Sequence, residues 1–332
     1  MRIDNLVRIV EGELQSSPLI DAFESIHFES SKINRGDLFI AYEASEDAIF
    51  TAIQRGAYAI ISSENFNHND TEIAWIKVPS VTHAIIQILR FTCTQKTINF
   101  ILASSVQEAF LLALQSEKKI KKLPSGLIEL AKELVKAKPH SLFCLRDETL
   151  AFQLNPSTQH IEKSLHVNTL PKGLFISTLS NETHYFHEVK IPSLFASNFL
   201  GVVEYFHAQH IAYSLDSFSP IAHFYPQFIT SQLRKKEFGM GEKVLIFETD
   251  RTLLEEEISY LSQHTKGHET LLCIPKETPI AFECPFNIVY FSVTVDLEIL
   301  CSMSFKYALI LGEREHFDAF LTRDFSTQHS LF

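Results

Sequence analysis

The sequence has few cysteines, and they are widely separated. Among 332 residues there are five, an odd number, and no two of them form a Cys-x-x-Cys pair. Isolated cysteines of this kind do not build a disulfide framework or a zinc knuckle. The pattern therefore predicts a protein of a reducing compartment. The five are Cys93, Cys144, Cys273, Cys284 and Cys301.

Long apolar runs are also missing. The first residues, MRIDNLVRIVEGEL, are typical of an amphipathic helix or of the start of a strand-helix unit, and they lack the uninterrupted apolar stretch of a signal peptide. No window contains the roughly 20 consecutive apolar residues that a transmembrane helix needs. We therefore expect no membrane span and a cytoplasmic location. Hydrophobic residues still make up 45% of the chain, which is enough to build a buried core.

Positive charge is scarce. The chain has 29 Lys and Arg residues against 40 Asp and Glu, which gives a formal net charge of −11. An acidic chain repels phosphate backbones, so no nucleic-acid partner is expected. The acidic run 255–257 is interpreted as the first turn of a helix, where the helix dipole favours negative charge. The only basic cluster is typical of a solvated helix end or loop; it consists of Lys118, Lys119, Lys121 and Lys122.

Several motifs that carry chemistry do not occur. There is no Gly-x-Ser-x-Gly elbow and no His-Glu-x-x-His helix, so hydrolase chemistry has no local support. Gly239-x-Gly241 precedes a strand pattern and does not follow one, which excludes a dinucleotide fingerprint. Glu204 and His207 have the spacing used in di-iron bundles, but the second pair that such a site needs is missing. We expect no metal and no cofactor.

What the chain does have is an alternation of short apolar runs with helix-length connections. This alternation predicts an α/β protein with parallel, doubly wound sheets. Candidate helices cover about 81–94, 106–117, 126–138, 192–209 and 253–263. Candidate strands are 37–41, 57–61, 73–78, 98–102, 141–145, 173–176, 243–247, 270–274, 287–291 and 307–311.

The chain has SSKINRGDLFIA at 30–41 and AIQRGAYAII at 52–61. These segments resemble, in order and spacing, the "DSR…PGDLFVAL" strand and the "A…GA.AVV" element of the Mur ligase family, which acts in peptidoglycan precursor synthesis. They are the first of three groups of segments that resemble this family. In active relatives this domain recognises a uridine nucleotide. The resemblance therefore implies a vestigial nucleotide-sugar site, and its residues are Ser30, Ser31, Asp37 and Phe39.

The second segment begins the central domain. Active Mur ligases carry "TGSVGKTT" between a strand and a helix, whereas this chain has ASSVQEAF at 103–110. A phosphate-binding loop needs glycines that expose backbone N–H groups, a Lys on the phosphates and a hydroxyl on Mg²⁺. Ser104 and Gln107 replace the glycines, Glu108 replaces the Lys, and Ala109 replaces the hydroxyl. The resemblance implies that this degenerate loop does not bind ATP; its residues are Ser104, Ser105, Val106, Gln107, Glu108 and Ala109.

The third group supports the alignment and indicates a deletion. Residues 128–134 and 143–148 resemble the helix and the "VLN.DD" strand that follow the ATP loop in the family. In active relatives a long stretch before this helix carries the Mg²⁺-binding Glu and the catalytic His. Here only about ten residues, 118–127, fill that place. Further on, 191–198 is similar to "LPG.HNV.N", and 247–250 replaces "DDSYNANP" at the start of the C-terminal domain.

The resemblance is strongest to the branch that adds D-alanyl-D-alanine to a UDP-N-acetylmuramoyl-tripeptide. It implies a reduced three-domain architecture with an N-terminal domain at 1–96, a shortened central domain at 97–238 and a C-terminal Rossmann-like domain at 239–332. The sequence predicts a pseudoenzyme that serves as a binding, scaffold or regulatory protein, with other cell-wall synthesis proteins as partners. Two alternatives stay open: a divergent ATP-dependent peptidoglycan ligase with a rebuilt site, and a protein that senses a UDP-sugar-peptide.

Overall fold

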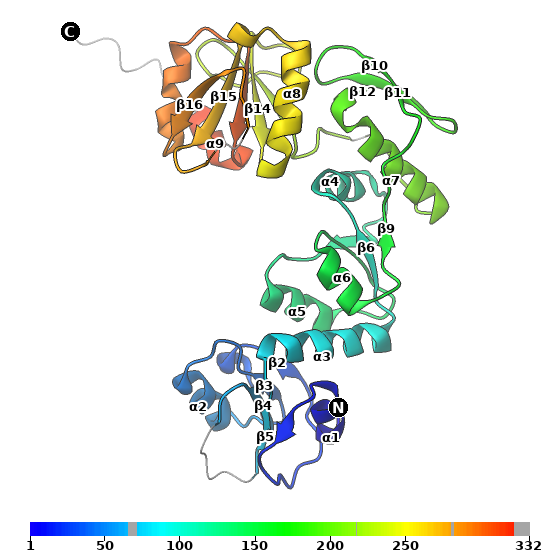
Figure 1. Ribbon diagram of the computed structural model, residues 1–332, viewed down its shortest axis with the longest axis vertical. Helices are drawn as coiled ribbons and strands as arrows, with labels where there is room; N and C mark the ends of the chain where they lie inside the picture. The colour runs from blue at the N-terminus through cyan, green and yellow to red at the C-terminus, as the bar shows by residue number, and fades with distance from the viewer. Residues whose placement is uncertain (66–71, 217, 280–281, 322–332) are drawn as a thin grey trace, which may run out of the picture. The chain divides into compact units, whose positions relative to one another are not determined.

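The computed structural model describes residues 1–65, 72–216, 218–279 and 282–321 (Figure 1). The chain packs as two compact units. Unit 1 consists of Met1–Ala103 and Lys119–His160, and unit 2 consists of Ser104–Lys118 together with the chain from Ile161 onward. The three domains expected at 1–96, 97–238 and 239–332 stay a prediction.

Unit 1 contains a five-stranded sheet in the order β1-β5-β4-β3-β2. Strands β2 to β5 are parallel, and β1 pairs antiparallel with β5. Gly56 follows the C-terminal end of helix α2 with a φ of +90°, a conformation that favours glycine. The elements are α1 Ile3–Ile9, β1 Glu13–Leu14, β2 Ile26–His27, η1 Ser30–Lys32, β3 Leu38–Ile40, α2 Glu46–Gln54, β4 Ala59–Ser62, β5 Ala74–Lys77 and α3 Val81–Lys96.

The second sheet of unit 1 has four parallel strands in the order β7-β8-β6-β9. The strands expected at 98–102 and 141–145 and the helix expected at 126–138 are confirmed. The elements are β6 Asn99–Leu102, β7 Ile120–Lys122, α5 Leu127–Lys136, β8 Leu142–Leu145, α6 Glu148–Leu154 and β9 Gln159–His160.

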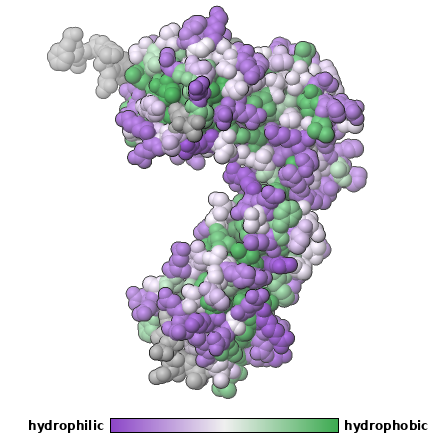
Figure 2. Space-filling model, in the orientation of Figure 1, coloured by the Kyte–Doolittle hydropathy of each residue, from purple (hydrophilic) through white to green (hydrophobic). Residues whose placement is uncertain are grey.

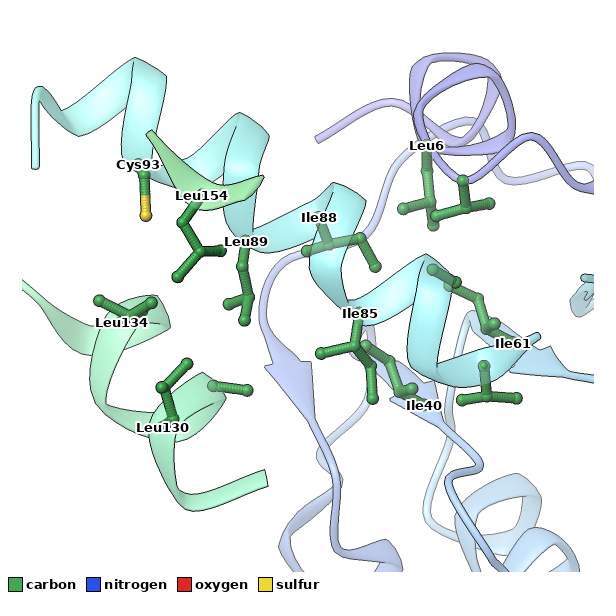
Figure 3. Packing of buried hydrophobic residues seen from close by; sticks show 14 of the residues in the cluster. Leu6, Ile40, Ile61, Ile85, Ile88, Leu89, Cys93, Leu130, Leu134 and Leu154 are labelled. Atoms are coloured by element: carbon green, nitrogen blue, oxygen red, sulfur yellow. The ribbon is translucent and has the colours of Figure 1, made fainter. Parts of the chain in front are cut away.

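Helix α3 joins the cores of these two sheets. Figure 3 shows Ile85 directed towards Ile40 of the first sheet, while Leu89 is directed towards Leu130 of α5. All four side chains belong to one continuous apolar cluster and are at most 2% exposed. A surface helix buries one stripe of apolar residues. Helix α3 buries side chains on two sides, and the packing of both sheets therefore depends on it.

Unit 2 begins with helices α4 and α7 and a three-stranded antiparallel meander, β10-β11-β12. The strand expected at 173–176 is wrong. These residues form the turn between β10 and β11, where Gly173 has a φ of +85°. Leu174 and Phe175 are buried in this turn without pairing in a sheet, which explains the apolar run. The elements are α4 Ser105–Leu114, β10 Asn168–Pro171, β11 Ser177–Ser180, β12 Tyr185–Val189, η2 Ser193–Phe195 and α7 Ala196–Ala208.

A five-stranded sheet completes unit 2, in the order β13-β14-β17-β15-β16. Its last four strands are parallel as expected, and β13 pairs antiparallel with β14. The carboxyl ends of parallel strands form the edge where α/β proteins place ligands. The elements are β13 Tyr225–Ile229, β14 Lys243–Glu248, η3 Arg251–Leu253, α8 Leu254–His264, η4 Gly267–Glu269, β15 Thr270–Pro275, β16 Asn287–Phe291, η5 Thr294–Cys301, β17 Tyr307–Leu311 and α9 Arg314–Leu321.

No helix in the described part of the chain is both long and apolar enough to cross a membrane. Figure 2 shows hydrophilic residues over much of one face of the molecule, with hydrophobic residues scattered between them.

The shared core of unit 1 leads to a test. We predict that Leu89→Ala lowers the free energy of unfolding by about 2–5 kcal/mol, because it leaves a cavity where α3 meets α5. Urea denaturation followed by circular dichroism measures this change. Arg90→Ala, at an exposed position of the same helix, should change it by no more than about 0.5 kcal/mol. Equal effects of the two substitutions would contradict the proposed role of α3.

Candidate functional site

The residues expected to form a degenerate ATP loop, 104–109, make up the N-cap and the first turn of α4, in unit 2. Ser104 caps the helix, and its hydroxyl oxygen accepts a hydrogen bond from the backbone N–H of Gln107 at 3.2 Å. In return, Oε1 of Gln107 accepts from the backbone N–H of Ser104 at 2.9 Å, which completes a capping box. Nε2 of Gln107 donates to the carbonyl oxygen of Ile161 at 3.0 Å. The Gln107 side chain thus occupies the turn.

The loop is packed inside unit 2. Ser105, Val106, Gln107 and Glu108 are between 2% and 8% exposed, whereas Ser104 is exposed and Ala109 is half-buried. A phosphate site needs backbone N–H groups that a ligand can approach. Here the cap of the helix is made by the protein's own side chains.

A carboxylate lies next to the same turn. The hydroxyl of Ser105 donates a hydrogen bond to the carboxylate of Asp250, which follows β14. Burial alone would raise the pKa of Asp250, but hydrogen bonds from Thr252 and Ser105 outweigh burial, and the pKa is lowered. The N-terminus of a helix favours an anion. In this protein the nearby anion belongs to the chain itself.

Glu248, the last residue of β14, is a buried carboxylate with many donors. It is 0% exposed. Oε1 accepts hydrogen bonds from Nδ1 of His223 at 2.7 Å and from the backbone N–H groups of Thr249 and Asp250 at 2.8 and 2.6 Å. Oε2 accepts from the backbone N–H of Phe224 at 3.1 Å. Burial alone would raise the pKa of Glu248, but these hydrogen bonds outweigh it and the pKa is lowered.

Glu257 of α8 faces Glu248, but its pKa is shifted in the opposite direction. It is also 0% exposed, and no hydrogen-bond donor among the described residues reaches either of its oxygens. Burial raises its pKa well above the ordinary value, and the negative charge of Glu248 raises it further. A buried carboxyl without donors is stable only when it is protonated. Glu257 is therefore neutral and donates its proton to Glu248. We refer to Glu257, Glu248 and His223 as the acid–histidine chain.

The residues of the expected nucleotide-sugar site lie in unit 1. Ser30 and Ser31 are in η1, where Ser31 is exposed and Ser30 is half-buried. Asp37 is 3% exposed, and its carboxylate accepts the backbone N–H of Asn34 at 2.8 Å. Phe39 is 1% exposed and packs in the apolar core. Of the four residues, the two serines are the ones that reach the surface. The site stays a prediction.

Glu204 and His207 lie on α7, as the spacing indicated. The Glu204 carboxylate accepts hydrogen bonds from the Ser164 hydroxyl and from Nδ2 of Asn181, both at 2.6 Å. The ring of His207 contacts the ring of His184 edge-on, with centroids 5.9 Å apart. Across residues 1–65, 72–216, 218–279 and 282–321, no group of three His, Cys, Asp or Glu residues could hold a metal ion.

The acid–histidine chain is not predicted by any motif in the sequence. The acidic run 255–257 forms the first turn of α8 as expected, and Glu255 and Glu256 are exposed. Glu257 is buried because it shares a helix face with Leu254 and Leu261. These three positions are spaced i, i+3 and i+7, so an acid in the apolar stripe was the signal that could have identified it.

Comparisons with known proteins identify the fold. No protein-family model matches the chain, and no curated protein sequence matches it. Among solved structures, the chain is similar to the MurF ligase from Thermotoga maritima in complex with ADP, with a TM-score of 0.60, 12% identity, and coverage of 88% of this chain and 95% of that one. It is also similar to MurF from Acinetobacter baumannii, with a TM-score of 0.57, 11% identity, and coverage of 96% and 97%. The expected Mur ligase-like α/β fold is confirmed.

The opposite pKa shifts of the two buried acids predict a distinct pH dependence. Because the pKa of Glu257 is raised above the ordinary 4.5 in the folded protein, its contribution to stability is complete below that value and is lost as the pH rises through the raised pKa. This loss amounts to at most about 1.4 kcal/mol per pH unit above pH 4.5. We predict that Glu257→Gln, which stays neutral, abolishes it. Chemical denaturation at a series of pH values measures the slope.

Glu255→Gln is the matched control, because it makes the same change at an exposed position of the same helix. It should leave the pH profile parallel to that of the wild type. The lowered pKa of Glu248 acts on the acid side, where its contribution is lost as the pH falls through that pKa. If the stability of Glu257→Gln and of the wild type falls equally as the pH rises above 4.5, Glu257 is not the proton-bearing partner.

Proposed function

We propose that this protein is a Mur ligase-like binding protein that does not carry out ATP-dependent ligation. The observation that carries this proposal is the closed N-terminus of α4, where Gln107 fills the helix turn and hydrogen-bonds to Ile161. The fold supplies a set of rigid surfaces, and the residues that would serve nucleotide chemistry in the family are replaced at this turn.

The electrostatics of the turn support the proposal. Glu108 occupies the position of the phosphate-binding Lys in the sequence motif and is 5% exposed. At 4 Å and an effective dielectric constant of about 20, exchanging a positive for a negative charge turns an attraction of about 4 kcal/mol into a repulsion of similar size. The Asp250 carboxylate, beside Ser105, adds a second negative charge. A triphosphate would have to displace Gln107 and approach both acids.

Ala109 also argues against binding of Mg²⁺ and ATP, because Mg²⁺ in phosphate-binding loops is held by a Ser or Thr oxygen and Ala109 has no hydroxyl. The likeness to MurF structures extends over most of this chain. We infer that selection has kept the architecture and not the nucleotide chemistry. A role as a scaffold or regulator of peptidoglycan precursor synthesis, with another cell-wall synthesis protein as partner, is the function that this combination supports best.

The ATP test is direct. We predict that 1 mM ATP with Mg²⁺ leaves the melting temperature of the protein within about 1 °C of its value without nucleotide. A site with a Kd of about 10 μM would stabilise the fold by about 2.7 kcal/mol at this concentration, a shift of several degrees. An active Mur ligase in the same buffer is the positive control. A saturable shift with ATP would favour the alternative of a ligase with a rebuilt site.

The same measurement with a UDP-N-acetylmuramoyl peptide addresses the sensing alternative, which predicts a shift with this ligand and none with ATP. The partner proposal is tested separately by calorimetry against a panel of purified cell-wall synthesis enzymes, active Mur ligases included. We predict binding to at least one of them in the micromolar range or tighter. If no member of the panel binds, the scaffold role is contradicted.

A further inference from the structure

We propose that unit 2 contains a binding site for a small anionic ligand with an aromatic ring. The site is a surface groove beside β13, which we call the lysine–aromatic groove. Its volume is about 220 Å³. A cavity of about 150 Å³ accommodates benzene, so the groove has room for one six-membered ring with a small charged group. Its principal lining residues are Lys190, Tyr225, Phe228, Lys236 and Phe238.

The two lysines are available to a ligand. Both Lys190 and Lys236 are exposed, and neither forms an ion pair within the part of the chain that the structure describes. Their neighbour Lys235 contrasts with them, because it is bound to Asp318 at 2.5 Å. The chain as a whole has a net charge of −11. Two lysines without an ion pair make this groove locally positive, which attracts an anion.

The groove also offers aromatic surface. The rings of Phe228 and Phe238 lie with centroids 4.9 Å apart and an interplanar angle of 59°, and both side chains are only half-buried. Nζ of Lys190 lies 5.1 Å from the centroid of the Phe238 ring. A flat ring gains from contact with such faces and edges. A ligand whose ring packs on these phenylalanines therefore brings its anionic group within range of Lys190.

The inner end of the groove approaches the acid–histidine chain. The groove shares Lys190, Phe218, Pro220 and Pro226 with a smaller apolar cavity, and His223 lines that cavity. The smaller cavity has a volume of about 10 Å³, room for about one water molecule. The ring of a ligand must therefore lie in the outer groove. Aromatic rings and polar side chains alternate around the outer groove, so one ligand can pack a ring on the former and place a charged group beside a lysine.

This inference is independent of the proposed function, because it uses neither the first turn of α4 nor a protein partner. The probes are phenyl phosphate and benzoate, which carry a phosphate and a carboxylate on the same ring. The controls are inorganic phosphate, which has the charge without the ring, and phenol, which has the ring without the charge. We expect phenyl phosphate or benzoate to bind at least tenfold more tightly than inorganic phosphate or phenol, as measured by calorimetry or by ligand-observed NMR. The stronger of the two anions identifies the charged group.

Variants locate the site. Lys190→Gln and Lys236→Gln should each weaken binding of the preferred probe about tenfold, as expected for the loss of a charge-assisted contact. Lys138→Gln removes the same charge from an exposed position outside the groove and should leave the affinity unchanged. Phe238→Leu, which keeps an apolar side chain, should weaken the aromatic probes and not inorganic phosphate. Equal binding of inorganic phosphate and phenyl phosphate, or unchanged affinity in both lysine variants, would overturn the proposal.

Discussion

The hydrogen bonds of the buried Glu248 carboxylate connect three separate segments of unit 2. This carboxylate accepts hydrogen bonds from His223 and Phe224, from the two residues that follow β14, and from the protonated carboxyl of Glu257 on α8. One side chain thereby holds together a connecting segment, the end of a central strand and a helix. A buried charge is tolerated only with such a full set of partners, and removing a partner from a buried pair typically costs about 3–5 kcal/mol.

The same region explains why the N-terminus of α4 is closed. The backbone N–H of Asp250 binds Glu248, while its carboxylate accepts the Ser105 hydroxyl. The loop after β14 is therefore tied to the buried acid on one side and to the helix turn on the other. Gln107 completes the arrangement from within the helix. The positive end of the α4 dipole faces groups of the protein, so the turn that resembles a phosphate-binding loop is part of the folded core.

Much of the fold could be predicted because its strands are short continuous apolar runs with helix-length connections, as at 243–247 and 307–311. Residues 173–176 have the same local pattern, but the strand predicted there is wrong. Leu174 and Phe175 are buried in a turn, and local sequence alone does not distinguish such a turn from a buried strand. The substitution of Gln107 could be read from the sequence, whereas its bond to Ile161 could not, since it joins residues 54 positions apart. The pairing of Glu248 with Glu257 likewise depends on tertiary burial.

The central claim, that the side chain of Gln107 closes the turn against nucleotide, is tested most directly by NMR. In a ¹⁵N-labelled sample, the backbone and side-chain amide resonances of Gln107 report on its bonds to Ser104 and Ile161. The account predicts that both resonances keep their positions, and that the side-chain amide stays protected from exchange, while ATP and Mg²⁺ are added to millimolar concentration. A saturable movement of both resonances with loss of that protection would contradict it.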